Sequence, residues 1–128
     1  MRIKALSVRA PWAHLISTGR KPIELRKQRL HYRGPLLICS AQKASKAQAL
    51  VTDEELAAAL AAPRGVAMCL VDVVDCRPAK PEDSHDACVA IGDGEWAWVL
   101  ANPRPVAQQH VSGLLGLFWA EVPDGVAT

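Results

Sequence analysis

A single carboxylate, Glu24, lies between Lys21 and Arg26 in the octet GRKPIELR at residues 19–26. Gly19 permits a left-handed turn, and Pro22 favours an extended conformation at Lys21. A lysine offers a compact charge for phosphate, whereas an arginine offers a planar fork for phosphate or a base edge. Glu24 can orient both cations, accept a proton, or accept a hydrogen bond from an exocyclic amine such as that of cytosine. The octet predicts an anion site with its own acid; the alternative is a solvated strand face whose ion pairs contribute about 0–1 kcal/mol each.

Charge is distributed unevenly along the chain. Residues 1–46 contain eleven lysines and arginines but only one acid, a formal charge of +10, and the remaining residues carry −8. The total of +2 conceals this polarity. Such asymmetry predicts a nucleic-acid or phosphate-bearing partner.

Two aromatic side chains are candidates for stacking on a base. Trp12 shares a helical stripe with Leu15 and Ile16, which favours core packing, although an indole beside a basic groove can stack on an unpaired base for about 1–3 kcal/mol. Tyr32 lies in a polar turn beside Arg33, so ligand contact and an ordinary turn role both remain open.

The elements that must position these residues alternate along the chain. Apolar runs predict strands at residues 3–8, 23–26, 36–40, 66–76, 96–100 and 114–122. A short helix should begin at Pro11 and end at Gly19, and an alanine-rich helix should span residues 44–62, with Thr52 as a second cap. A polar loop is expected at 77–94 and a break at 102–105. Five or six strands with two main helices predict a small α+β barrel rather than a doubly wound sheet.

The length of 128 residues predicts one domain spanning residues 1–128. The four cysteines form no C-x-x-C pair, so we expect no metal site, and we predict no cofactor. Cys39 and Cys69 lie within apolar runs and are expected in the core. No apolar run reaches the roughly 20 residues of a membrane span, and no signal peptide is apparent, which predicts a cytoplasmic protein without a membrane partner.

Five ordered blocks resemble the ASCH domain family. They are ALSVRAPWAHLI at 5–16, the octet as G-x-K-x-x-E-x-R, YRGP at 32–35, WAWVL at 96–100 and GLLGL at 113–117. The resemblance implies a mixed β-barrel of the PUA-like superfamily, with a cleft between the barrel and the first helix that takes RNA or nucleotide-like ligands.

Some small ASCH proteins remove an acetyl group from the exocyclic amine of cytidine, and the resemblance suggests a lysine base, a threonine nucleophile and a later carboxylate. Lys21 matches the lysine and Asp72 the later carboxylate, but Glu24 stands at the position of the threonine. A water-based route would use Glu24 or Asp72 as general base and Lys21 to stabilise the oxyanion.

The sequence therefore predicts an RNA-, nucleotide- or nucleoside-binding cleft centred on Lys21, Glu24 and Arg26. A hydrolase acting on N-acylated cytidine or on RNA through the same cleft is the first alternative, and a protein-interaction module using the acidic half is the second. Supporting ligand contacts are expected from Ser7, Arg9, Trp12, Tyr32 and Arg33.

Overall fold

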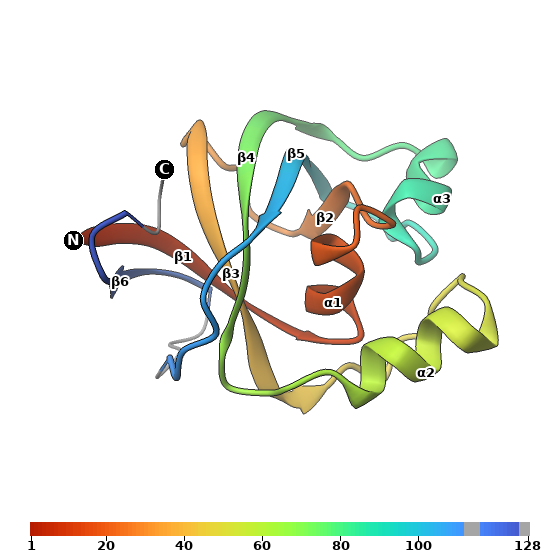
Figure 1. Ribbon diagram of the computed structural model, residues 1–128. Helices are drawn as coiled ribbons and strands as arrows, with labels where there is room; N and C mark the ends of the chain where they lie inside the picture. The colour runs from red at the N-terminus through yellow and green to blue at the C-terminus, as the bar shows by residue number, and fades with distance from the viewer. Residues whose placement is uncertain (112–115, 126–128) are drawn as a thin grey trace.

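The structure of the protein is a computed structural model, and residues 1–111 and 116–125 are described. Along the chain the elements are β1 (Arg2–Ala10), α1 (Trp12–Ser17), β2 (Ile23–Arg26), β3 (Gly34–Ala44), α2 (Asp53–Ala61), β4 (Ala67–Pro78), the short 3-10 helix η1 (Pro81–Asp83), α3 (Ser84–Ala87), β5 (Trp96–Pro105) and β6 (Leu117–Glu121). The curved sheet lies to one side in Figure 1, and α1, α2 and α3 gather on the other.

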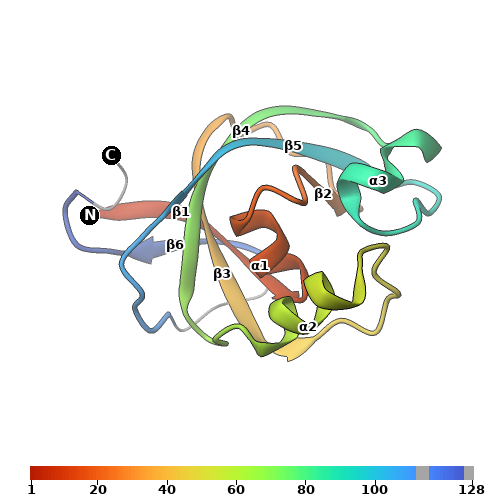
Figure 2. The same cartoon turned by 45° about the vertical axis from the view of Figure 1, so that its right-hand side comes forward.

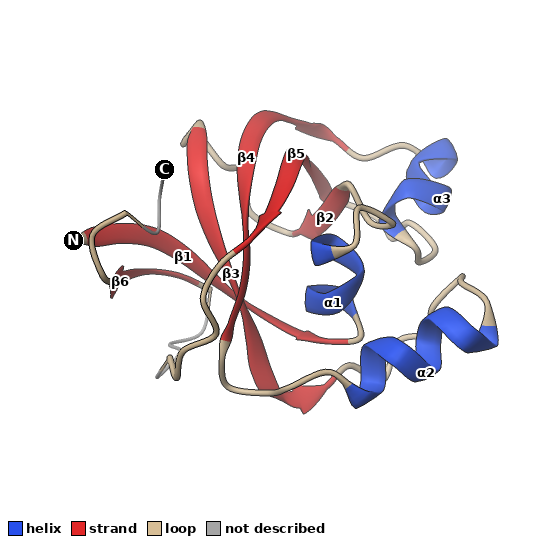
Figure 3. Ribbon diagram, viewed as in Figure 1, coloured by secondary structure: helices blue, strands red, loops and turns tan. Residues whose placement is uncertain are grey.

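The strands form one mixed sheet in the order β2-β5-β4-β3-β1-β6. β1 and β3 are parallel, and every other adjacent pair is antiparallel. The short strands β2 and β6 occupy the two edges and do not pair with each other, so the described sheet is strongly curved but not closed (Figure 3). The predicted α+β fold of five or six strands is confirmed: in the described part of the chain the sheet has six strands and is not closed, and three α-helices accompany it where two main helices were expected.

Both faces of the sheet bury apolar side chains. Leu6 and Val8 of β1 face a cluster that includes Ile16 of α1, whereas Ile3 and Ala5 face a second cluster containing Phe118. This division follows from the alternation of side chains along a strand. The sheet curves around α1, which packs against its concave side (Figure 2).

The predicted core cysteines are confirmed as buried free thiols. Cys39 and Cys69 are 2% and 1% exposed, and burial raises the pKa of each thiol to about 12. Neither thiol is therefore ionised near neutral pH.

Helix α1 begins at Trp12, one residue after the predicted start at Pro11, and ends before Gly19, whose φ of +82° lies in the left-handed region. The backbone N–H of Gly19 donates to Ile16, and that of Lys21 donates to Leu15, so the chain turns back across the end of the helix. This turn delivers Lys21 to the beginning of β2.

The prediction of a helix across residues 44–62 is wrong at its first half, because α2 begins only at Asp53. A reciprocal capping box fixes this start: Glu55 N–H donates to Thr52 Oγ1 at 3.1 Å, and Thr52 N–H donates to Glu55 Oε1 at 3.0 Å. Alanine favours a helix but does not specify where one begins. Residues 45–52 instead form an irregular segment, in which Ala47 N–H donates to Ser45 Oγ at 3.1 Å.

Other boundaries also differ from the prediction. β5 continues through the expected break at 102–105, because Asn102 adopts φ +56° beside a register shift between Leu70 and Asp72 of β4. Asparagine tolerates this conformation better than most residues do. β4 runs to Pro78, and the rest of the expected loop at 77–94 contains η1 and α3. The last strand begins at Leu117; residues 114 and 115 of its predicted range lie outside the described residues.

Candidate functional site

A cleft of about 600 Å³ lies between the end of β1, helix α1, strand β2 and the segments 41–47 and 89–95. Its lining includes six residues that the sequence singled out: Ser7, Arg9, Trp12, Lys21, Glu24 and Arg26. A volume of this size lies within the range of small-molecule sites, about 300–1,000 Å³.

Glu24 lies at the centre of the charged group and is shared by two cations. Its Oε2 accepts from Arg26 Nε at 2.9 Å and lies 2.8 Å from Arg26 Nη2, a two-pronged contact to a single oxygen. Its Oε1 lies 3.6 Å from Lys21 Nζ, an ion pair that is too long for a hydrogen bond. The acid thus has one strongly bound oxygen and one loosely paired oxygen.

Lys21 is buried, with 2% of its side chain exposed. Its ammonium donates to the Ala87 carbonyl at 2.6 Å, lies over the Trp12 ring at 5.0 Å and has Glu24 as its counter-ion. Burial lowers the pKa of Lys21, and the negative charge of Glu24 opposes that shift. The two residues nevertheless form one buried, mutually compensated pair.

Arg26 connects two strands at the floor of the cleft. It is half-buried, and besides holding Glu24 it donates through Nη2 to the Ser7 carbonyl of β1 at 3.3 Å. Glu24 and Arg26 lie two residues apart on β2, so their side chains share one face of the strand.

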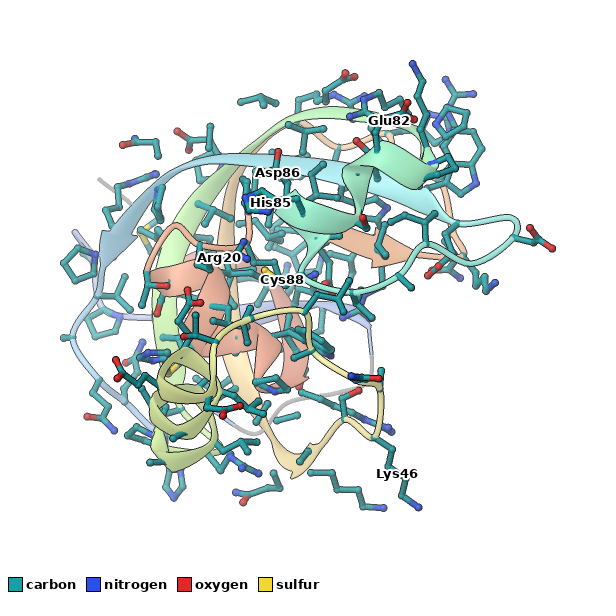
Figure 4. All side chains as sticks on the ribbon, turned by 90° about the vertical axis from the view of Figure 1, so that its right-hand side faces the viewer. Arg20, Lys46, Glu82, His85, Asp86 and Cys88 are labelled. Carbon is teal, nitrogen blue, oxygen red and sulfur yellow. The ribbon has the colours of Figure 1, made fainter. Side chains whose placement is uncertain are left out.

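Arg20, the residue before Lys21, contacts three segments behind the cleft: the segment before α2, helix α2 and helix α3. Its guanidinium donates to the carbonyls of His85 at 2.9 Å and Leu50 at 3.3 Å, and its Nε lies 3.2 Å from Glu55 Oε2. Cys88 Sγ accepts from Arg20 Nη1 at 3.3 Å. Figure 4 shows Arg20 and Cys88 beside each other, between α3 and the segment before α2.

Sequence reasoning did not assign a role to Arg20 or to the backbone at Ala87. Both contacts span about 65 residues along the chain, so no local pattern predicts them. The only available signal was the length of the loop at 77–94, which is typical of functional segments. The sequence also missed Lys27, Ser45, Ala47, Val89, Ala90 and Glu95, all of which line the cleft.

Three predicted site residues do not line the cleft. Asp72 lies on β4 opposite Pro35 and pairs through Oδ1 with Arg104 at 3.1 Å. Tyr32 donates its hydroxyl to the Pro35 carbonyl, and Arg33 lies 3.9 Å from Asp75. Asp72 is therefore not grouped with Lys21 and Glu24. Its neighbours Val71 and Val73 face the cluster that contains Ile16 of α1, so the Asp72 side chain points to the opposite face of the sheet.

Within residues 1–111 and 116–125, no group of three or more histidine, cysteine, aspartate or glutamate side chains is arranged to hold a metal ion. None of the helices in the same described part of the chain is long and apolar enough to cross a membrane.

The open mixed sheet curved around α1, with a basic cleft beside that helix, defines an α+β fold of the PUA-like type. The family model of the ASCH domain matches residues 6–110, and the chain belongs to this family. The expected resemblance is thereby confirmed.

Solved structures agree on the fold. The chain is similar to the crystal structure of an ASCH protein from Zymomonas mobilis, with a TM-score of 0.63, 12% identity, and coverage of 92% of this chain and 87% of that one. A mutant of the Zymomonas mobilis protein matches with a TM-score of 0.59 and 11% identity, covering 92% of this chain and 89% of the other. No curated protein sequence matches the chain.

Proposed function

We propose that this ASCH-domain protein binds RNA or a nucleotide in the cleft beside α1, with a base directed toward Lys21, Glu24 and Arg26. The regional charge supports an anionic ligand, since residues 1–46 carry +10 and contribute most of the charged groups of the cleft. The concave shape supports a ligand that enters the protein rather than one that lies on a flat surface.

The observation that carries this proposal is the unequal pairing of the two Glu24 oxygens. Oε2 receives both prongs of Arg26, whereas Oε1 has only the Lys21 ammonium, at 3.6 Å, among the residues that the structure describes. A buried carboxylate oxygen at a cleft wall favours a ligand that brings an N–H donor. An exocyclic amine or a ring N–H of a nucleobase is such a donor.

Trp12 supplies the apolar part of the same wall. It is half-buried, packs against the core cluster and also lines the cleft. The two roles left open by its helical spacing are thus compatible, because one part of a large indole can pack inside while another borders the cleft.

The test is a comparison of wild-type protein with Glu24→Gln in binding single-stranded RNA and the four nucleoside 5′-monophosphates, measured by calorimetry. A charge-assisted hydrogen bond contributes about 1.5–3 kcal/mol, so we expect affinity to fall by about 10- to 100-fold in Glu24→Gln. Asp72→Asn is the matched control, because it removes an acid that does not line the cleft. Equal losses in the two variants, or no binding by wild-type protein, would refute the proposal.

A second candidate, hydrolysis in the same cleft, is favoured by the position of the Lys21 ammonium, 3.6 Å from the Glu24 carboxylate in the cleft lining. Glu24 would activate a water molecule and the Lys21 ammonium would stabilise the developing oxyanion. Turnover of N-acylated cytidine or RNA by wild-type protein, lost in Lys21→Ala, is the expected result if chemistry follows binding. Binding without turnover of either substrate would leave the protein as a binding module.

A further inference from the structure

We infer that the cleft has a phosphate subsite at its rim, formed by Arg9 and Lys27, which holds the phosphate of a ligand whose base lies deeper. This inference rests on the proposed function and adds to it the class of ligand: a nucleoside phosphate, as a monoester or a phosphodiester, rather than a free nucleoside. The argument depends on how the cations of the cleft are paired.

The deep cations already share one carboxylate. Lys21 and Arg26 both lie against Glu24, and Lys21 additionally donates to the Ala87 carbonyl. A ligand anion that approached them would compete with a carboxylate already in place. The deep part therefore favours a neutral group with hydrogen-bond donors over a phosphate.

The rim cations, Arg9 and Lys27, differ from the deep cations in their exposure and in their pairing. Both are exposed and both line the cleft. Among the described residues Arg9 has no hydrogen-bond or ion-pair partner, and Lys27 donates only to the neutral carbonyl of Asp93, at 2.7 Å. A lysine ammonium has three donors and a guanidinium has five, so both groups retain free donors for an anion.

The two rim cations come from different elements that meet at the cleft. Arg9 lies near the end of β1, and Lys27 directly follows β2. The acid that lines the cleft besides Glu24 is Glu95, whose Oε1 accepts from the Gly92 N–H at 2.6 Å. The described lining thus holds four cations against two carboxylates. Lys21 and Arg26 share the Glu24 carboxylate, whereas neither Arg9 nor Lys27 is paired with an acid among the described residues.

Lys46 adds to the positive potential beside the rim. It lies between the lining residues Ser45 and Ala47, and its side chain extends away from the ribbon into solvent (Figure 4). An arginine fork together with lysine point charges is the combination that suits phosphate oxygens. A carboxylate ligand would use fewer of these donors, because it has two oxygens where a phosphate monoester has three.

The test compares each nucleoside with its 5′-monophosphate and with a dinucleoside monophosphate, by calorimetry at low salt. We expect the monophosphate or the dinucleotide to bind at least about tenfold more tightly than the nucleoside. Arg9→Gln and Lys27→Gln should each reduce this affinity ratio severalfold. The matched control is Lys80→Gln, which removes an exposed cation outside the cleft and should leave the ratio unchanged.

The outcomes separate this inference from the function on which it rests. A tighter monophosphate identifies a terminal phosphate as the source, whereas a tighter dinucleotide identifies the backbone of an RNA strand; both support the subsite. Equal affinities for nucleoside and phosphates, or a ratio that neither rim variant lowers, would overturn the subsite and leave the proposed function standing. Failure of every probe and of RNA to bind would overturn both.

Discussion

Lys21 places its ammonium group in the interior with three partners of different kinds: a carbonyl, a carboxylate and an aromatic ring. Its spacing from Glu24 and Arg26 could be read from the sequence, because residues 24 and 26 share a strand face and residue 21 follows a helix-ending glycine. The depth at which Lys21 is buried could not be predicted from the sequence, because its partner Ala87 comes from a distant part of the chain.

The lowered pKa of Lys21 links its protonation to stability. Its folded pKa lies below the ordinary 10.5, so the unfolded chain binds more protons at pH values between the two. The Lys21 contribution to the free energy of unfolding must therefore rise with pH across that window, because burial penalises only the charged form.

The prediction is tested by urea unfolding of wild-type protein and Lys21→Met from pH 7.5 to 10.5. The variant keeps an unbranched side chain of similar length but has no titrating group. We expect the stability difference, wild type minus variant, to become more favourable to wild type as pH rises. A difference that is constant or falls with pH would contradict a lowered pKa at this lysine.

The irregular segment 45–52 and helix α3 are held together behind the cleft by few contacts. Leu50 N–H donates to the Cys88 carbonyl at 2.7 Å, and Arg20 bonds both segments. Ser45, Ala47, Val89 and Ala90 continue these segments into the cleft lining, so Arg20 joins two segments that both border the cleft.

Arg20→Met should loosen both segments while retaining the apolar stem. We expect a loss of about 1–2 kcal/mol in the free energy of unfolding and faster amide hydrogen exchange at 46–52 and 84–90. Arg64→Met is the matched control, because Arg64 also donates to two carbonyls, those of Gln42 and Leu60, but joins neither segment to the other. Unchanged exchange in Arg20→Met would show that the segments are held by other contacts.

The strands and the first helix were predictable because apolar alternation and the proline and glycine positions are local signals. The start of α2 could have been predicted only by giving the capping box at Thr52 more weight than the helix propensity of the preceding alanines. The continuation of β5 through Asn102 depends on its pairing with β4, which is not a local signal. The separation of Asp72 from the cleft was not predicted either, because it depends on which face of β4 packs against α1.

Cations from the basic N-terminal part of the chain gather at two places on the molecule. One is the cleft; the other surrounds Trp119 of β6, which is 54% exposed and lies within 5.0 Å of Arg2 and 4.8 Å of Lys4. Lys4 also lies over the Tyr32 ring at 5.6 Å. This Trp119 surface offers cations and aromatic rings but does not line the cleft. It is therefore the alternative place on this protein where an RNA ligand could bind.

The central claim is that the ligand enters the cleft and meets Glu24. A crystal structure of the protein with a bound nucleoside 5′-monophosphate tests it most directly. The account predicts a base N–H within hydrogen-bond distance of Glu24 Oε1 and the phosphate between Arg9 and Lys27. A nucleotide bound on the Trp119 surface, with the cleft empty in the same crystal, would contradict it.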